Sequence, residues 1–195
     1  MDCIASGDES SGAGADGNWV YAMAFPLVRV DLADTVRAGL RALLPPGASY
    51  LHFYDLTPKR RTEVARGLAM LPWEAALIVS RLTTGRRQEQ ARTRILTHAL
   101  PRLQHHERVR RLLLESRARA DRRDASLVLR LRGSRSITHE LFISHVPKTS
   151  DELTWLADFI VGAFVAGQVR GNSEAWAILE EACVLDTVWL PPDLP

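Results

Sequence analysis

Residues 3–30 read CIASGDESSGAGADGNWVYAMAFPLVRV, and this stretch decides how the fold begins. Residues 3–8 are small or apolar and residues 19–30 are aromatic and β-branched, so both segments have the composition of a strand. Residues 10–17 between them are rich in Gly, Ser and Asp and predict a loop. We expect the strands to pair as an antiparallel hairpin, with Pro26 at a bulge or near an edge because proline donates no ladder hydrogen bond.

Beyond this hairpin, predicted helices and strands alternate along the chain. Thr57 before Pro58 marks the start of one helix, and Thr149 with Glu152 forms a capping box that predicts another. Pro101 is expected to kink or interrupt the arginine-rich helix around it. The alternation predicts an α/β fold with one mixed sheet flanked by helices. Helices are expected at 31–44, 58–70, 86–105, 121–131, 150–169 and 173–181, and strands at 50–54, 73–82, 109–115 and 137–146.

The composition is that of an ordinary globular protein, and we expect residues 1–195 to form a single domain. Hydrophobic residues make up 46% and charged residues 25%, which argues against disorder throughout the chain. The two cysteines, Cys3 and Cys183, predict buried thiols in a reducing compartment rather than a disulfide framework. The most apolar segment, residues 159–165, is shorter than the roughly 20 residues of a membrane span. We expect a cytoplasmic protein without a signal peptide.

Positive charge is unevenly spread along the chain. The formal net charge is only +2, but arginines concentrate between Arg81 and Arg135. This basic region can attract the phosphate backbone of a nucleic acid, which is the partner we consider. The alternative is that these arginines form solvated helix faces in an arginine-rich chain. Trp155 is expected to pack in the core, and it can stack on a base only if it lines a groove.

An acid inside an apolar helix is the most telling single feature. Asp158 is surrounded by Leu, Ala, Phe, Ile and Val, and a helix that is apolar all round is normally buried. An ionised carboxylate buried alone is costly, so Asp158 needs a cation or several hydrogen-bond donors. Thr154 and Gly162, one turn away on either side, are small and leave room around the carboxylate. The alternative is a salt bridge from Asp158 to an arginine.

Two further acids stand at predicted strand ends. Glu115 follows an apolar strand, and ligand sites of open α/β sheets form at the carboxyl ends of strands. The alternative interpretation of Glu115 is a surface ion pair with Arg117 or Arg119. Asp8 ends the first strand, where it could also serve only as a turn former. Together with Asp158 these acids predict a site for Mg²⁺ or Mn²⁺, because hard cations prefer oxygen ligands. Two such ions about 4 Å apart can activate a water and stabilise the leaving oxygen in phosphodiester cleavage.

Four segments, in this order along nearly the whole chain, resemble motifs of the domain-of-unknown-function 3800 family. They correspond to an opening strand ending in Asp-Glu-Ser, a short second motif, a central strand that carries an acid, and a closing Ala-Asp helix. The resemblance implies a ribonuclease H-like fold, with Asp8, Glu115 and Asp158 as metal ligands and Glu9 as an adjacent member. The segments are CIASGDES at 3–10, LHF at 51–53, LLLESR at 112–117 and LTWLADFIVGA at 153–163.

The chain departs from the family pattern at the second motif, where a carboxylate is expected. It offers His52 and Asp55 there instead: Asp55 can supply an oxygen ligand, and His52 can act on a water or a proton as a neutral imidazole. Our first hypothesis is a metal-dependent nuclease. The alternative is a catalytically inactive relative that binds nucleic acid or a protein partner. A third possibility is a structural protein whose acids pair with arginines.

Overall fold

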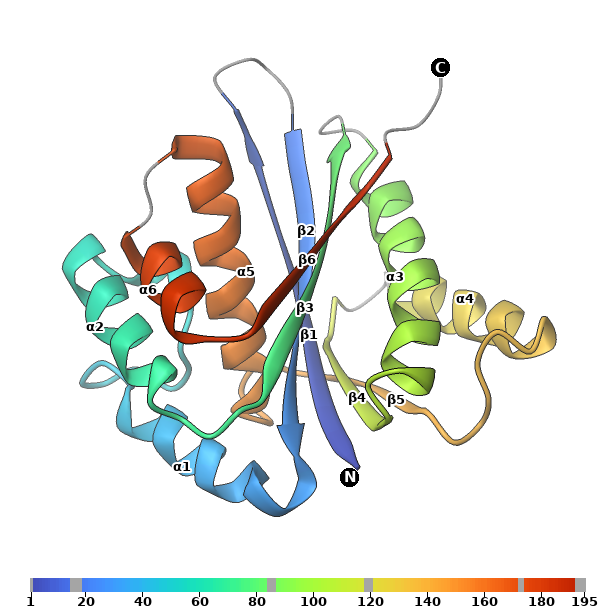
Figure 1. Ribbon diagram of the computed structural model, residues 1–195, viewed down its shortest axis with the longest axis horizontal. Helices are drawn as coiled ribbons and strands as arrows, with labels where there is room; N and C mark the ends of the chain where they lie inside the picture. The colour runs from blue at the N-terminus through green and yellow to red at the C-terminus, as the bar shows by residue number, and fades with distance from the viewer. Residues whose placement is uncertain (1, 15–18, 84–86, 118–120, 172–173, 192–195) are drawn as a thin grey trace.

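The computed structural model describes residues 2–14, 19–83, 87–117, 121–171 and 174–191. Six strands in these residues form one sheet in the order β5-β4-β1-β2-β3-β6 (Figure 1). β1 and β2 form the expected antiparallel hairpin, β3 pairs antiparallel to β2, and the remaining pairs are parallel. The sheet is therefore mixed, as the sequence predicts. The strands are β1 (Cys3–Ala13), β2 (Trp19–Arg29), β3 (Ala75–Thr83), β4 (Val109–Glu115), β5 (Phe142–Val146) and β6 (Leu185–Leu190).

Helices cover both faces of this sheet. Figure 1 shows α1, α2, α5 and α6 on one side of it and α3 and α4 on the other. Two 3-10 turns, η1 (Val30–Leu32) and η2 (Phe53–Asp55), join these elements. The expected fold class, a mixed sheet flanked by helices, is confirmed. The helices are α1 (Ala33–Ala42), α2 (Pro58–Ala69), α3 (Gln88–His105), α4 (Asp121–Gly133), α5 (Leu153–Arg170) and α6 (Glu174–Ala182).

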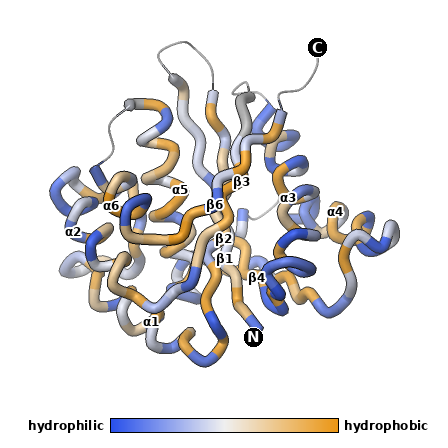
Figure 2. The backbone as a smooth tube through the Cα atoms, viewed as in Figure 1, coloured by the Kyte–Doolittle hydropathy of each residue, from blue (hydrophilic) through white to orange (hydrophobic). Residues whose placement is uncertain are grey.

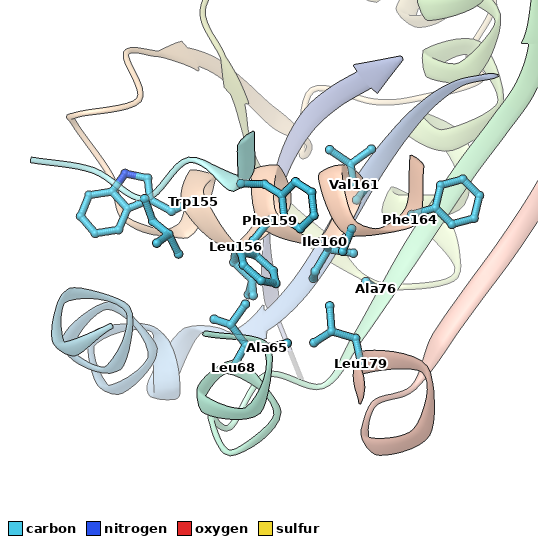
Figure 3. Close-up of a cluster of buried hydrophobic side chains, with 14 of the residues drawn as sticks. Ala65, Leu68, Ala76, Trp155, Leu156, Phe159, Ile160, Val161, Phe164 and Leu179 are labelled. Carbon is cyan, nitrogen blue, oxygen red and sulfur yellow. The ribbon is translucent and has the colours of Figure 1, made fainter. Parts of the chain in front are cut away.

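Each face of the sheet has its own hydrophobic core. On the α5 side, Phe159, Ile160 and Phe164 pack with residues of α2, α6 and β3 (Figure 3). On the α3 side, the apolar faces of α3 and α4 pack on alternate residues of β1, β2 and β3. Figure 2 shows α5 as a largely hydrophobic helix, whereas α2 is hydrophilic over much of its length. Burial of α5 on all sides follows from this composition.

The first strand is longer than the sequence predicts. We expected a loop from residue 10, but β1 continues to Ala13, and Ser10 to Ala13 pair with Ala22 to Trp19. Gly12 lets this extended part of β1 approach α5, because a Cβ at this position would lie 3.0 Å from Val169 of α5. Small residues here let the hairpin lie directly on the helix. Residues 15–18 lie outside the described part of the chain.

Other predicted elements differ more. The strand expected at 50–54 is wrong: this segment is extended only up to His52 and then forms η2. The strand expected at 137–146 begins only at Phe142, and the buried side chains of Ile137 and Leu141 anchor an irregular segment before it. Pro26 lies inside the central strand β2, and the β1–β2 pairs next to it, between Ala5 and Asp8, are missing.

The expected capping box of the longest apolar helix is also wrong. α5 begins at Leu153, three residues later than predicted, and Glu152 makes no side-chain cap. Instead, Asp151 accepts a hydrogen bond from Leu153 N at 3.0 Å, while Ser150 N bonds to Pro147 O in a turn. The turn at Pro147 takes up the residues that would have formed the first helical turn.

The predicted cap of α2 is confirmed. Thr57 caps α2 by accepting a hydrogen bond from Arg60 N, with Pro58 in the first turn as expected. The interruption considered at Pro101 does not occur, because α3 continues through Pro101 to His105. No single helix among the described residues is long and apolar enough to cross a membrane, and α5 and α6 meet the length and composition criteria only as a pair bent by 118°.

Candidate acid site

Three acids from distant parts of the chain meet on the α5 side of the sheet. β1 and β4 are parallel neighbours with Gly7 paired to Leu114, so Asp8 and Glu115, each one residue further, lie side by side. Asp158 approaches them from α5, which packs along β1. Asp8 and Asp158 are buried. The structure thus brings together the three acids that the sequence singles out.

A lysine lies between these acids. Lys148 Nζ is 2.7 Å from Asp158 Oδ2, 3.0 Å from Glu115 Oε2 and 3.7 Å from Asp8 Oδ2. Asp158 and Glu115 pair with this lysine and not with the arginines considered from the sequence. Arg117 pairs with Glu9 and Glu89 instead, and Arg119 lies outside the described residues. One ammonium group is shared by all three carboxylates.

The Asp158 carboxylate is fully supplied with donors. Oδ1 accepts a hydrogen bond from Phe53 N at 2.8 Å, and Oδ2 contacts His52 Nδ1 at 2.6 Å and Lys148 Nζ at 2.7 Å. The second motif therefore reaches the acid site through His52 and a backbone amide. This explains why residues 50–54 form no strand, since their polar groups bond to Asp158 and to Arg61, whose Nε donates to Phe53 O.

Gly162 has a different role from the one expected. We predicted that this glycine leaves room around the Asp158 carboxylate, but the Phe53 side chain fills that room. A Cβ on Gly162 would lie 2.7 Å from Phe53 Cβ. The close approach places Phe53 N on Asp158, and the Arg61 guanidinium lies over the Phe53 ring at 4.3 Å from its centroid.

The site shifts the proton affinities of its groups in opposite directions. Burial and the nearby charges of Asp158 and Glu115 hold the pKa of Asp8 well above its usual value. Burial also raises the pKa of Asp158, but the His52 hydrogen bond and the Lys148 charge outweigh it and lower that pKa. The hydrogen bond to Asp158 raises the pKa of His52. Such opposed shifts in one site are typical of functional centres.

The acids open into a pocket of about 210 Å³. Asp55 is exposed and is not among the described residues that line the pocket. Tyr54 lies at the pocket instead, with its hydroxyl 3.2 Å from Ser10 Oγ. The second motif thus offers the pocket His52 and Tyr54 rather than Asp55. The lining residues are Asp8, Glu9, Ser10, His52, Tyr54, Glu115, Arg117, Lys148, Asp158 and Gly162.

Glu9 belongs to a second charge cluster. Successive residues of a strand face opposite sides of the sheet, so Glu9 turns toward α3 when Asp8 faces α5. There it pairs with Arg92, a guanidinium only 1% exposed, and with Arg117 Nε at 3.3 Å. Arg92 Nη2 also donates to Asp124 Oδ2 at 2.8 Å. The structure does not bring the Glu9 carboxylate to the other three acids.

This second cluster predicts a pH-dependent stability. Burial raises the pKa of Asp124, but bonds from His145 and Arg92 outweigh it and lower that pKa to about 2. An unfolded aspartate titrates near about 3.9, so the native state binds fewer protons and is stabilised above that pH. This contribution, about 2 kcal/mol, is lost as the pH falls from about 4 toward 2. Urea unfolding of wild type and Asp124→Asn should give a stability difference that shrinks over this range, and a pH-independent difference would contradict the assignment.

The arginine-rich region serves partly inside the protein. Arg92 and Arg117 pair with buried acids, and Arg102 pairs with Glu107 and Asp186. Exposed arginines include Arg111, Arg122 and Arg130 on β4 and α4. Arg86 and Arg119 lie outside the described residues, as does the side chain of Arg81. Only part of the predicted basic region is therefore free to attract a nucleic acid.

Sequence reasoning missed Lys148, whereas its expectation that Trp155 packs in the core is confirmed. Trp155 is 3% exposed and its Nε1 donates to Lys148 O at 2.7 Å, so it anchors the lysine and offers no stacking face. One signal was available for Lys148, because it is one of only two lysines in an arginine-rich chain. Its position before α5 also puts it at the end of the sheet where the acids lie.

The donor set suits a hard divalent cation. Lys148 supplies one positive charge to three acids in a largely buried site, and the raised pKa of Asp8 shows that this charge does not fully compensate them. Glu115 Oε2 is buried and accepts no hydrogen bond, and its charged partner is Lys148 Nζ at 3.0 Å. As the side chains stand, no three His, Cys, Asp or Glu among the described residues are arranged around a common metal position. The ammonium of Lys148 lies between the carboxylates instead.

Comparison with solved structures defines the class of fold. The chain resembles ribonuclease H2 from Pyrococcus horikoshii OT3, with a TM-score of 0.57 and 14% identity over 87% of this chain and 74% of that chain. It also resembles ribonuclease HII from Archaeoglobus fulgidus, solved in complex with PCNA, with a TM-score of 0.50 and 14% identity over 91% and 76% of the two chains. The chain therefore has a ribonuclease H-like fold.

The sequence comparisons assign the chain to no family. No family model matches the chain, and no curated protein does. The resemblance to the domain-of-unknown-function 3800 family stays a prediction carried by its four segments.

Proposed function

We propose that this protein is a divalent-metal-dependent nuclease of ribonuclease H-like type that hydrolyses phosphodiester bonds in RNA or DNA. The observation that supports it best is the convergence of Asp8, Glu115 and Asp158 around a single ammonium at a pocket of the sheet. Three carboxylates that share one positive charge form an incomplete cation site. The ribonuclease H-like fold supports the same class of reaction by analogy.

In this proposal the three carboxylates form the cation site. A bound Mg²⁺ or Mn²⁺ supplies a Lewis acid that activates water and neutralises charge on the phosphate. His52, held on Asp158 by its Nδ1, is the adjacent group that can hold or release a proton near neutral pH. Exposed arginines such as Arg122 and Arg130 add positive charge that draws in the nucleic-acid backbone.

The second candidate is an inactive relative that binds nucleic acid or a protein partner. Two observations favour it: Asp55 is exposed and adds no oxygen to the acid site, and Lys148 lies at the centre of the acids. Under this proposal Lys148 replaces the metal ion permanently. Nucleic-acid binding without cleavage, weakening steeply with salt, is then expected.

A combined binding and cleavage experiment separates the candidates. We expect Mg²⁺ or Mn²⁺ to raise the unfolding temperature, because an ion that binds only the native state stabilises it by about 2.7 kcal/mol at 100 times its Kd. We also expect Mn²⁺-dependent cleavage of labelled single-stranded RNA, DNA or an RNA–DNA hybrid. The absence of both metal-dependent stabilisation and cleavage would reject the nuclease. A mobility shift of the nucleic acid without cleavage would favour the inactive binder.

A further inference from the structure

We propose that Tyr54 is a stacking platform for an unpaired base of the substrate, so that the acid site acts on single-stranded or locally unpaired nucleic acid. The inference rests on the proposed nuclease function and names the form of its substrate. Tyr54 is a substrate-binding residue in this role: it holds a base beside the acids and takes no part in the chemistry.

Tyr54 lies at the acid pocket on the same side of β1 as Asp8. It lines the pocket, and its hydroxyl is 3.2 Å from Ser10 Oγ. Ser10 follows Asp8 by two residues in β1, and alternate residues of a strand face the same side of the sheet about 7 Å apart. The Tyr54 hydroxyl is therefore fixed next to the acids, within reach of a base whose phosphate lies at Asp8.

The ring of Tyr54 is exposed and yet held in place. The residue is 42% exposed. The Phe53 ring stands perpendicular to it, with the two centroids 5.2 Å apart, and the Arg61 guanidinium lies 5.6 Å from the Tyr54 centroid. A tyrosine that is fixed before binding offers contact area to a ligand at a low cost in conformational entropy. Trp155, the aromatic residue considered for stacking from the sequence, is buried and offers none.

The surroundings of Tyr54 favour a nucleotide as the ligand. Under the proposed function the acid side of the pocket takes the phosphate through a cation. The Tyr54 ring can stack on any base, because every base has a π face. Exposed Tyr50, whose ring centroid is 6.0 Å from Lys148 Nζ, adds a second aromatic side chain near the acids. One nucleotide carries both a phosphate and a base, so a strand of nucleic acid matches both parts of this surface.

Stacking on Tyr54 requires a base that is free of its neighbours. Inside a duplex each base is paired and stacked, and turning one out of the stack costs free energy. Single strands, loops and bulges present bases that can stack directly on an aromatic side chain. The pocket should therefore prefer a single strand of RNA or DNA to the duplex of the same sequence.

Binding to matched oligonucleotides tests the inference. We use fluorescence anisotropy at low salt, with Ca²⁺ in place of Mn²⁺, on a labelled unstructured single strand and on its duplex. We expect the wild type to bind the single strand more tightly than the duplex. Tyr54→Leu should weaken single-strand binding about 10-fold, the loss expected for one stacked base, and leave duplex binding unchanged. Tyr54→Phe keeps the ring and should retain most of the affinity.

A matched control and a second measurement accompany this variant. Trp189→Leu removes an aromatic residue that is 46% exposed on the edge strand β6, and it should bind both oligonucleotides as the wild type does. A strand made of abasic nucleotides keeps every phosphate but has no base to stack. The wild type should bind it about 10-fold more weakly than the normal strand, and Tyr54→Leu should bind the two strands alike.

The outcomes distinguish this inference from the proposed function. Equal single-strand affinity of folded Tyr54→Leu and the wild type would overturn the role of Tyr54, and so would equal affinity of the wild type for normal and abasic strands. Failure of the wild type to bind any oligonucleotide would overturn it as well. Mn²⁺-dependent cleavage is read separately: cleavage without a Tyr54 effect leaves the nuclease standing, and Tyr54-dependent binding without cleavage supports the stacking but rejects the nuclease. If thermal unfolding shows that Tyr54→Leu folds poorly, the abasic strand with the wild type decides.

Discussion

Asp158→Asn should lower Mn²⁺-dependent cleavage by at least about 100-fold, the upper end of the loss seen when groups that merely support a metal site are changed. Asparagine is nearly the same size, so the α5 core around it stays filled. Its amide removes the negative charge and turns a donor toward His52 and Lys148, which are themselves donors at 2.6 and 2.7 Å from Asp158 Oδ2. The ammonium then loses its closest anionic partner, and metal-dependent stabilisation should fall with activity.

The control for this change is an acid that takes no part in the site. Asp34→Asn on α1 removes a carboxylate that is 98% exposed, and it should leave both cleavage and metal-dependent stabilisation unchanged. Glu115→Gln is a second test if Asp158→Asn folds poorly. Cleavage and metal-dependent stabilisation at wild-type levels in folded Asp158→Asn and Glu115→Gln would remove the basis of the nuclease proposal.

Arg92→Met should destabilise the protein by about 3–5 kcal/mol, the usual cost of removing one partner from a buried ion cluster. The Arg92 side chain is 1% exposed and lies between Glu9 and Asp124. Methionine fills much of the same volume but leaves the buried Asp124 and the partly buried Glu9 without their main cation. The loss should appear as a lower urea midpoint with little change in slope.

Two further variants show whether charge causes the loss. Glu9→Gln and Asp124→Asn, added to Arg92→Met, neutralise the stranded carboxylates and should recover much of the stability, because it is the uncompensated charge that is costly. Arg130→Ala on the exposed face of α4 should change stability by less than about 0.5 kcal/mol. If the triple variant is no more stable than Arg92→Met, packing rather than charge explains the role of Arg92.

The sequence predicts well those elements whose signals are local or periodic. The hairpin, β4 and the cap of α2 follow from alternation, an apolar run and the Thr57-Pro58 pair. It fails where tertiary contacts decide. Residues 50–54 have strand composition, but the backbone N–H and C=O of Phe53 form hydrogen bonds with Asp158 and Arg61 instead of with a neighbouring strand. The start of α5 moves because a turn at Pro147 competes with the first helical turn.

In the candidate site, too, local sequence signals identify some residues and only the tertiary fold identifies others. Asp8, Glu115 and Asp158 are visible in the sequence because each is an acid in an apolar setting or at a strand end. The partner of these acids is not visible, because no spacing rule connects Lys148 to them. Only the fold brings the loop before α5 to the middle of β1 and the end of β4. The opposite orientations of Asp8 and Glu9 follow from strand alternation. The cation that pairs with Glu9 is Arg92 of α3, and only the tertiary fold brings it there.

The neighbouring acids of β1 also protect the alignment of the hairpin. Asp8 lies opposite Ala24 and Glu9 opposite Met23, and the two carboxylates face different sides of the sheet. Sliding the strand by one residue would exchange them, sending Glu9 among the three-acid group and Asp8 toward a guanidinium pocket fitted to a longer side chain. Mispaired hairpins are thus penalised on both faces at once, and an insertion or deletion ahead of Asp8 is a change this protein should tolerate poorly.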